Sequence, residues 1–215
     1  MSAGDKRVAN LWLADELWKL GAVQFGDFTL GETAVHSPVY VNLRLLISSP
    51  EVLQRTVAVM RDEVRALQSM RHPQMAHYDL VAGVPFGGLH LATAYSLRSG
   101  IPMIYLYPAK NGEGTIVEGT YEGGQTVLII DDLITGGRSL IQTAERLAAE
   151  DLFIDNALVL IDRQQGGSER LKREGINVIS ILTLESILHY LGSSHKIPEE
   201  WYHKSIEYLL KQRSG

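Results

Sequence analysis

The segment Val127–Leu140, VLIIDDLITGGRSL, constrains the fold more than any other part of this chain. Its four leading apolar residues predict a buried parallel strand, and residues 140–147 predict the helix that follows. Asp131 and Asp132 stand where this strand is expected to end, two apolar residues before a glycine-rich turn. Open α/β sheets bind ligands at the carboxyl ends of their strands. The segment therefore predicts a ligand site at that edge of a parallel sheet.

The turn suits a phosphate group. Glycines let backbone N–H groups approach an anion, the Thr and Ser hydroxyls add donors, and the start of a helix carries the positive end of its dipole. These residues are Thr135, Gly136, Gly137, Arg138 and Ser139. Two carboxylates cannot serve the same phosphate, so we expect Asp131 and Asp132 to face ribose hydroxyls. The predicted ligand is a ribose 5-phosphate, and an ordinary strand–turn–helix with solvated acids is the alternative.

Strand and helix patterns alternate along most of the chain, which predicts an α/β fold with a central parallel sheet flanked by helices. The strand patterns cover residues 79–84, 101–106, 126–131, 156–162 and 176–182, and the helix patterns cover 87–99, 138–149 and 168–175. Residues 107–124 interrupt the alternation, being polar, rich in glycine and aperiodic. A long connection of this kind inside a compact domain is usually functional or mobile.

The two ends of the chain have other patterns. Residues 8–20 predict a helix, 25–44 a small strand-rich flap, and 50–70 a second amphipathic helix, while 184–191 and 198–212 predict a closing helix pair. We expect one domain over residues 1–215. Its parts would be an N-terminal helix and hood over about 1–48, a core over about 49–192 and a C-terminal helix over about 193–215.

The amino-acid composition argues against several classes of partner and site. The formal net charge of −5, with no run of basic residues, argues against a nucleic-acid-binding surface, which needs a basic stripe. The absence of cysteine excludes disulfides, thiol nucleophiles and zinc–thiolate sites. No signal peptide and no apolar span of about 18 residues is recognisable. We therefore expect no nucleic-acid partner, no membrane partner and a cytoplasmic location.

A second glycine-rich turn follows the strand predicted at 79–84. It contains Pro85, Phe86, Gly87 and Gly88, and it leads into a helix. Two anion-binding turns on one sheet edge would suit a ligand with phosphates at both ends, such as 5-phosphoribosyl-1-pyrophosphate (PRPP). A Gly-Gly pair alone is weak support, and an ordinary turn is the alternative.

The Asp-Asp strand end with its Thr-Gly-Gly-x-Ser turn resembles the PRPP signature of type I phosphoribosyltransferases. Further segments resemble orotate phosphoribosyltransferases in order and spacing: FGDFTL (25–30), SPVYVNLR (37–44), residues 83–103 and LVLIDRQQGG (158–167). The resemblance implies the type I phosphoribosyltransferase fold with a small N-terminal hood, and a homodimer. It also implies transfer of a 5-phosphoribosyl group from PRPP to orotate, giving orotidine 5′-monophosphate and pyrophosphate, with Mg²⁺ as cofactor. That reaction belongs to pyrimidine nucleotide biosynthesis.

The resemblance also implies residue roles. Asp131 and Asp132 would serve the ribose and hold Mg²⁺ indirectly, through PRPP or water, while residues 135–139 would bind the 5′-phosphate and residues 85–88 the pyrophosphate. The base would contact Arg163, Tyr40 and Phe28. Pairing of Arg163 with the orotate carboxylate is sensible because a guanidinium binds a carboxylate bidentately. A surface ion pair with Asp162 or Glu169 is the alternative for Arg163.

The chain departs from the family in its basic groups. Tyr107 and Pro108 stand where an Arg-Lys pair is usual, and Lys110 is the candidate loop lysine, the only basic residue between Arg98 and Arg138. Further departures are Gly136 for Thr or Ser, Gly31-Glu32-Thr33 for Lys-Ser-Gly, and His90 for proline. We therefore expect PRPP binding with slow turnover. The alternatives are a phosphoribosyltransferase for another base, and a non-catalytic PRPP- or nucleotide-binding regulatory protein.

Overall fold

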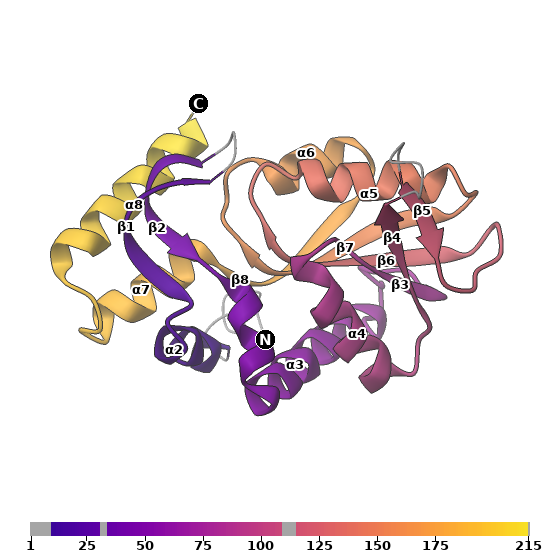
Figure 1. Ribbon diagram of the computed structural model, residues 1–215, viewed down its shortest axis with the longest axis horizontal. Coiled ribbons are helices and arrows are strands. Elements are labelled where there is room, and N and C mark those ends of the chain that lie inside the picture. The colour runs from indigo at the N-terminus through magenta and orange to yellow at the C-terminus, as the bar shows by residue number, and fades with distance from the viewer. Residues whose placement is uncertain (1–9, 31–33, 109–114, 215) are drawn as a thin grey trace.

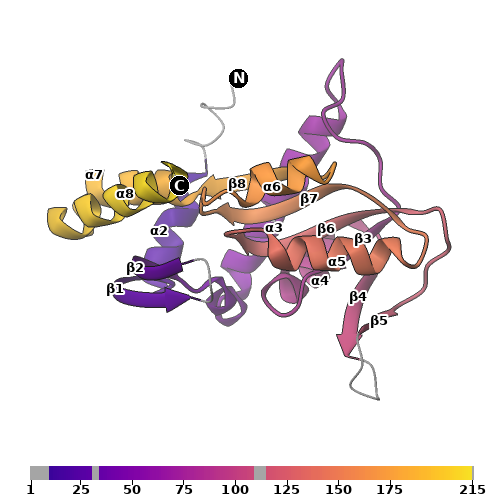
Figure 2. The same ribbon diagram turned by 90° about the horizontal axis from the view of Figure 1, so that it is seen from above.

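The computed structural model describes residues 10–30, 34–108 and 115–214 (Figures 1 and 2). Its centre is a six-stranded sheet in the order β5-β4-β3-β6-β7-β8. The strands are β3 (Leu80–Gly83), β4 (Met103–Pro108), β5 (Thr115–Glu118), β6 (Thr126–Ile134), β7 (Phe153–Asp162) and β8 (Asn177–Thr183). All neighbouring pairs are parallel except β4 and β5. The predicted α/β class with a central, mostly parallel sheet is confirmed.

Helices cover both faces of this sheet (Figure 1). One face packs against α5 (Arg138–Ala148) and α6 (Gly167–Arg173), and the other against α3 (Pro50–Gln68) and α4 (Gly87–Ser99). Along β6 the side chains alternate between two hydrophobic clusters, since Val127 and Ile129 belong to one and Leu128 and Ile130 to the other. Burial on both faces explains why this strand is apolar without interruption.

The N-terminal and C-terminal segments meet beside the sheet (Figure 1). The strands β1 (Val23–Leu30) and β2 (Ala34–Val41) form an antiparallel pair, which we call the hood. The helix α8 (Glu199–Ser214) packs against β2, and α2 (Leu11–Lys19) packs against α7 (Leu184–Ser193). Aromatic contacts join the ends of the chain, because the Phe25 ring lies 6.2 Å from Trp18 and 6.1 Å from Trp201 between centroids.

Some predicted boundaries are wrong. The stretch 107–124 is not all loop, because β4 continues to Pro108 and pairs with β5, Tyr107 opposite Ile116. The strand β6 runs beyond the acids to Ile134, since the apolar Leu133 and Ile134 continue the ladder with β7. A 3₁₀ helix, η1 (Leu43–Ser48), follows the hood and was not predicted.

Within the described residues, no helix combines the length and the apolar character that crossing a membrane requires.

Candidate active site

Asp131 and Asp132 lie near the carboxyl end of β6. Asp131 is only 6% exposed, and its Oδ1 accepts the backbone N–H of Asp132 at 2.8 Å. Burial, and then the charge of Asp132, raise the pKa of Asp131 well above its ordinary value of 3.8. Burial also raises the pKa of Asp132. Two confined carboxylates of this kind gain stability when a ligand brings hydrogen-bond donors or positive charge to them.

The turn at residues 85–88 packs directly on these acids. A Cβ at Gly87 would overlap the Asp132 carboxylate, and a Cβ at Gly88 would overlap the Ile130 carbonyl and crowd Asp131. Glycine is therefore required at both positions, so that the backbone can approach the acids closely. From the sequence, an ordinary turn was the alternative to an anion-binding turn at these residues. The structure places the turn in contact with Asp131 and Asp132.

The predicted phosphate turn begins directly after β6. Gly137 precedes α5 and has a φ of 77°, a left-handed conformation that favours glycine. A Cβ there would also overlap Leu171 of α6, and one at Gly167 would overlap the Thr135 carbonyl. The turn is thus held against α6, while Ser139 in the first turn of α5 is exposed. Exposed donors at a helix N-terminus are suited to an anion.

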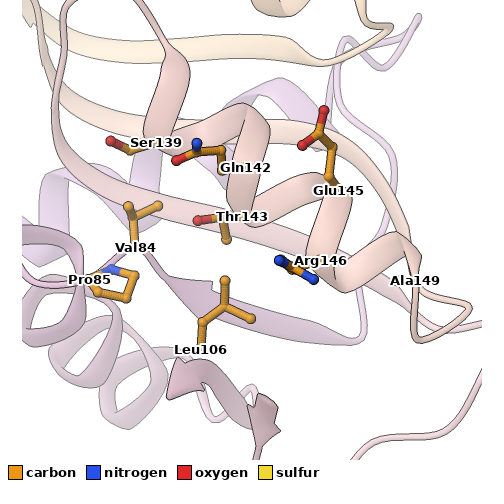
Figure 3. Close-up of a pocket in the computed structure, with 9 residues that line it drawn as sticks. All are labelled: Val84, Pro85, Leu106, Ser139, Gln142, Thr143, Glu145, Arg146 and Ala149. Carbon is orange, nitrogen blue, oxygen red and sulfur yellow. The ribbon is translucent and has the colours of Figure 1, made fainter. Parts of the chain in front are cut away.

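The two turns border one cavity of about 630 Å³ (Figure 3). Pro85 of the first turn and the preceding Val84 line it on one side, and Ser139 of the second turn lines it on the other. The cavity continues along α5, where its lining includes Gln142, Thr143, Glu145, Arg146 and Ala149, with Leu106 of β4 opposite. The topology therefore brings together the two turns that the sequence predicted as phosphate sites.

The predicted base-binding residues gather near the hood. The rings of Phe28 and Tyr40 lie 5.5 Å apart between centroids, and both are half-buried. Arg163 is 2% exposed, and its Nη2 donates to Ser37 Oγ at 3.0 Å while its Nε donates to Gln165 Oε1 at 3.0 Å. Burial lowers the pKa of Arg163. This guanidinium connects the end of β7 to the hood.

The alternative reading of Arg163 as a surface ion pair is wrong. Asp162 instead accepts the backbone N–H of Gln164 at 2.6 Å and the Ser168 hydroxyl at 2.7 Å. Among residues 10–30, 34–108 and 115–214, no carboxylate lies within 4.0 Å of the Arg163 guanidinium. Its charge is therefore available to an anionic ligand.

Two residues without a predicted role also belong to this site. The charges of His90 in α4 and Arg44 in η1 both lower the pKa of Asp132, against the effect of burial. A partial signal was available, because Arg44 ends the SPVYVNLR segment and His90 stands where the family has proline, in the helix after the first turn. Lys110, the predicted loop lysine, lies outside the described residues.

No group of three or more His, Cys, Asp or Glu side chains in the described part of the chain could hold a metal ion. Asp131 and Asp132 supply two neighbouring carboxylates without a third ligand of this kind. They fit a metal ion that takes most of its ligands from a substrate and from water.

Comparison with known proteins identifies the family. Residues 59–183 match the family described as "Phosphoribosyl transferase domain". The orotate phosphoribosyltransferase of Chlamydia caviae is 40% identical over 187 residues, which cover 85% of this chain and 86% of that protein. Its counterpart in Caenorhabditis elegans is 33% identical over 199 residues, 92% of this chain and 84% of that protein.

A solved structure agrees. The crystal structure of orotate phosphoribosyltransferase from Aeropyrum pernix is 33% identical, with a TM-score of 0.70 over 84% of this chain and 99% of that one. The type I phosphoribosyltransferase fold expected from the sequence is therefore confirmed. The chain belongs to the orotate phosphoribosyltransferases, a group within the phosphoribosyl transferase domain family.

Proposed function

We propose that this chain transfers a 5-phosphoribosyl group from PRPP to orotate, giving orotidine 5′-monophosphate and pyrophosphate. One observation carries the proposal: the buried Asp131 and the half-buried Asp132 lie in contact with the turn at residues 85–88 and two residues before the turn at 135–139. This arrangement offers carboxylates for a ribose between two sites for anions. PRPP has a ribose between a phosphate and a pyrophosphate, so its charge pattern matches.

The reaction displaces pyrophosphate from C1 of PRPP by a ring nitrogen of orotate. Positive charge develops on the ribose and negative charge on the leaving pyrophosphate. Asp131 and Asp132 can accept hydrogen bonds from the ribose hydroxyls and stabilise the developing positive charge electrostatically. The backbone of residues 135–139 fixes the 5′-phosphate, so that C1 is held at the position where orotate arrives.

The base site in this proposal combines a ring pair with a cation. Phe28 and Tyr40 offer aromatic surface to a planar pyrimidine. Arg163 has used Nη2 and Nε in its contacts to Ser37 and Gln165, and a guanidinium carries further N–H donors for the orotate carboxylate. Orotate is an anion, so it would supply the negative charge that no described residue places within 4.0 Å of this buried cation.

Three further features belong to the proposal. Mg²⁺ would be held indirectly by Asp131 and Asp132, and it would supply positive charge at the pyrophosphate and ribose oxygens. A homodimer is part of the proposal because the resemblance to orotate phosphoribosyltransferases implies one. A cytoplasmic location is supported by the absence of cysteine from the sequence.

The test is incubation with PRPP, Mg²⁺ and a panel of free bases, with pyrophosphate release as the readout. Release that depends on orotate, together with orotidine 5′-monophosphate in the product, supports the proposal. If pyrophosphate is released with another base and not with orotate, that base is the substrate and the assignment of orotate is wrong. Sedimentation of the purified chain measures its oligomeric state separately.

One observation favours a second candidate function. Tyr107 and Pro108 end β4 without a cation, and Tyr107 is 49% exposed. A PRPP-binding protein without turnover would need the turns and the acids but not the basic loop. Tight PRPP binding without pyrophosphate release from any base would identify that function.

A further inference from the structure

Arg44 is fixed in place by neutral partners. Its Nη2 donates to the Tyr40 hydroxyl at 3.0 Å, and its Nε donates to Asn42 Oδ1 at 3.1 Å. In the described part of the chain no carboxylate lies within 4.0 Å of it, and the residue is exposed. Two hydrogen bonds use two of the five N–H donors of a guanidinium. Arg44 therefore offers an oriented positive charge with donors left for a ligand.

The charge of Arg44 acts on two groups of the site, His90 and Asp132. Burial lowers the pKa of His90, Asp132 raises it and Arg44 lowers it, so the three groups act on one another. Asp132 lies under the turn at residues 85–88, and His90 lies in the first turn of the helix that follows this turn. Packing of η1 against both α4 and β6 agrees with this placement. Arg44 thus stands on an element that packs against the strand carrying Asp132 and against the helix that follows the turn expected to meet pyrophosphate.

One ring nitrogen of His90, at this site, lacks a hydrogen-bond partner among the described residues. Nε2 of His90 is enclosed, and no described residue pairs with it. Buried polar atoms without a partner are uncommon in native structures, and a missing ligand or water is one of the usual reasons. The site around His90 and Arg44 is therefore incomplete without a polar ligand.

The charges around Arg44 indicate which polar ligand it would bind. Asp131 and Asp132 bring negative charge, and PRPP brings more at its pyrophosphate end. The strand β4 ends there in Tyr107 and Pro108, so it supplies no cation within the described residues. Arg44 is an arginine on η1, which packs against both β6 and α4, the elements on either side of this site.

We propose that Arg44, positioned by Tyr40 and Asn42, binds the pyrophosphate group of PRPP and thereby replaces the basic pair that β4 lacks. The proposal rests on the proposed function and adds a residue to the site. Because the Tyr40 ring also packs at a tilt against the Phe28 ring, Arg44 connects the base site to the pyrophosphate site. Binding of one substrate would therefore help to fix the other.

Calorimetry with Mg²⁺ and inorganic pyrophosphate, and separately with ribose 5-phosphate and with orotidine 5′-monophosphate, tests the assignment. Arg44→Gln should weaken pyrophosphate binding by about 10- to 100-fold, the effect of losing one charged hydrogen bond, and leave ribose 5-phosphate within about twofold. Arg44→Lys should recover part of the loss, since it restores the charge without the planar donors. Arg71→Gln, an exposed arginine in the loop after α3, is the matched control.

The variant Tyr40→Phe tests whether the Tyr40 hydroxyl positions Arg44, because it removes that hydroxyl and keeps the aromatic ring. It keeps the ring against Phe28 and removes the oxygen that accepts from Arg44, so pyrophosphate affinity should fall, by less than in Arg44→Gln. Pyrophosphate binding in Arg44→Gln equal to that in Arg71→Gln would overturn the proposal. A loss confined to orotidine 5′-monophosphate would also overturn it, because Arg44 would then belong to the base.

The two proposals fail separately. Unmodified protein that binds pyrophosphate through Arg44 but releases none from PRPP and orotate refutes only the proposed function. Protein that turns over orotate, with an Arg44→Gln variant of unchanged pyrophosphate affinity, refutes only the role of Arg44.

Discussion

The guanidinium of Arg163 and the hydroxyl of Ser37, 126 residues apart in the sequence, are joined by a hydrogen bond of 3.0 Å in the protein interior. Ser37 Oγ in turn donates to the Val39 carbonyl at 2.8 Å. Through these contacts Arg163, the residue that follows β7, attaches the hood beside the sheet. Recognition of the base and attachment of the hood therefore depend on the same side chain.

We expect Arg163→Ala to raise the KM for orotate much more than the KM for PRPP, because the orotate carboxylate loses its bidentate partner. Steady-state kinetics with each substrate varied in turn measures the difference. Ser37→Ala leaves a buried cation without one acceptor and should lower the free energy of unfolding by about 1.5–3 kcal/mol in urea titrations. Equal increases in both KM values would mean that Arg163 supports structure and not recognition.

Gly87→Ala should weaken PRPP binding, because the added Cβ displaces the Asp132 carboxylate from its position under the turn. Isothermal calorimetry with Mg²⁺ and PRPP gives the affinity. Gly100→Ala is the matched control: Gly100 has a φ of 76° and open space around its Cβ position, far along α4. That control should lose about 1 kcal/mol of stability through backbone strain and keep the PRPP affinity. Similar affinities in the two variants would contradict the contact.

Asp131→Asn should change how stability depends on pH. The folded pKa of Asp131 is raised above its ordinary value of 3.8, so between these two values the folded chain binds more protons than the unfolded chain. Its free energy of unfolding therefore falls as the pH rises through that window and levels off above the folded pKa. Asparagine does not titrate, so the Asp131→Asn variant lacks this pH-dependent contribution to the free energy of unfolding.

The stability of Asp131→Asn relative to the unsubstituted protein should accordingly increase as the pH rises above about 4, and it should level off once the folded Asp131 is ionised. Urea titrations at several pH values measure the difference, and Asp155→Asn, an exposed acid on β7, is the control. A stability difference that is constant over this range would show that Asp131 is not held in a raised-pKa environment. PRPP affinity should fall in the same variant, because a carboxylate acceptor is lost.

Turnover of orotate should be slow, with PRPP binding preserved, because β4 ends in Tyr107 and Pro108. Loss of a preorganised group that stabilises transition-state charge typically costs about 10²- to 10³-fold in rate. Both positions are exposed, so Tyr107→Arg with Pro108→Lys should be tolerated and should raise kcat toward the value of an enzyme with a basic loop.

The same double replacement should reduce the effect of Arg44→Gln, because two cations would then share one role. If the unsubstituted protein already turns over orotate at tens per second, within the usual enzyme range of about 1–10³ s⁻¹, the altered loop is not a defect.

Much of this protein was predictable from local patterns. The uninterrupted apolar run before Asp131 indicated a strand buried on both faces, and alternation with helices indicated a parallel sheet. Glycines before α5 indicated a turn at the sheet edge. These features depend on neighbouring residues in the chain, which is why a sequence reveals them.

Other features were decided by tertiary structure. The continuation of β6 to Ile134 depends on pairing with β7, and the pairing of Tyr107 with Ile116 depends on a hairpin that no local pattern showed. Burial of Arg163 depends on Ser37, from the other end of the chain. The meeting of Arg44, His90 and Asp132 likewise depends on how η1, α4 and β6 pack. The sequence alone determined which side chains could do the chemistry, and packing between distant segments decided which of them meet.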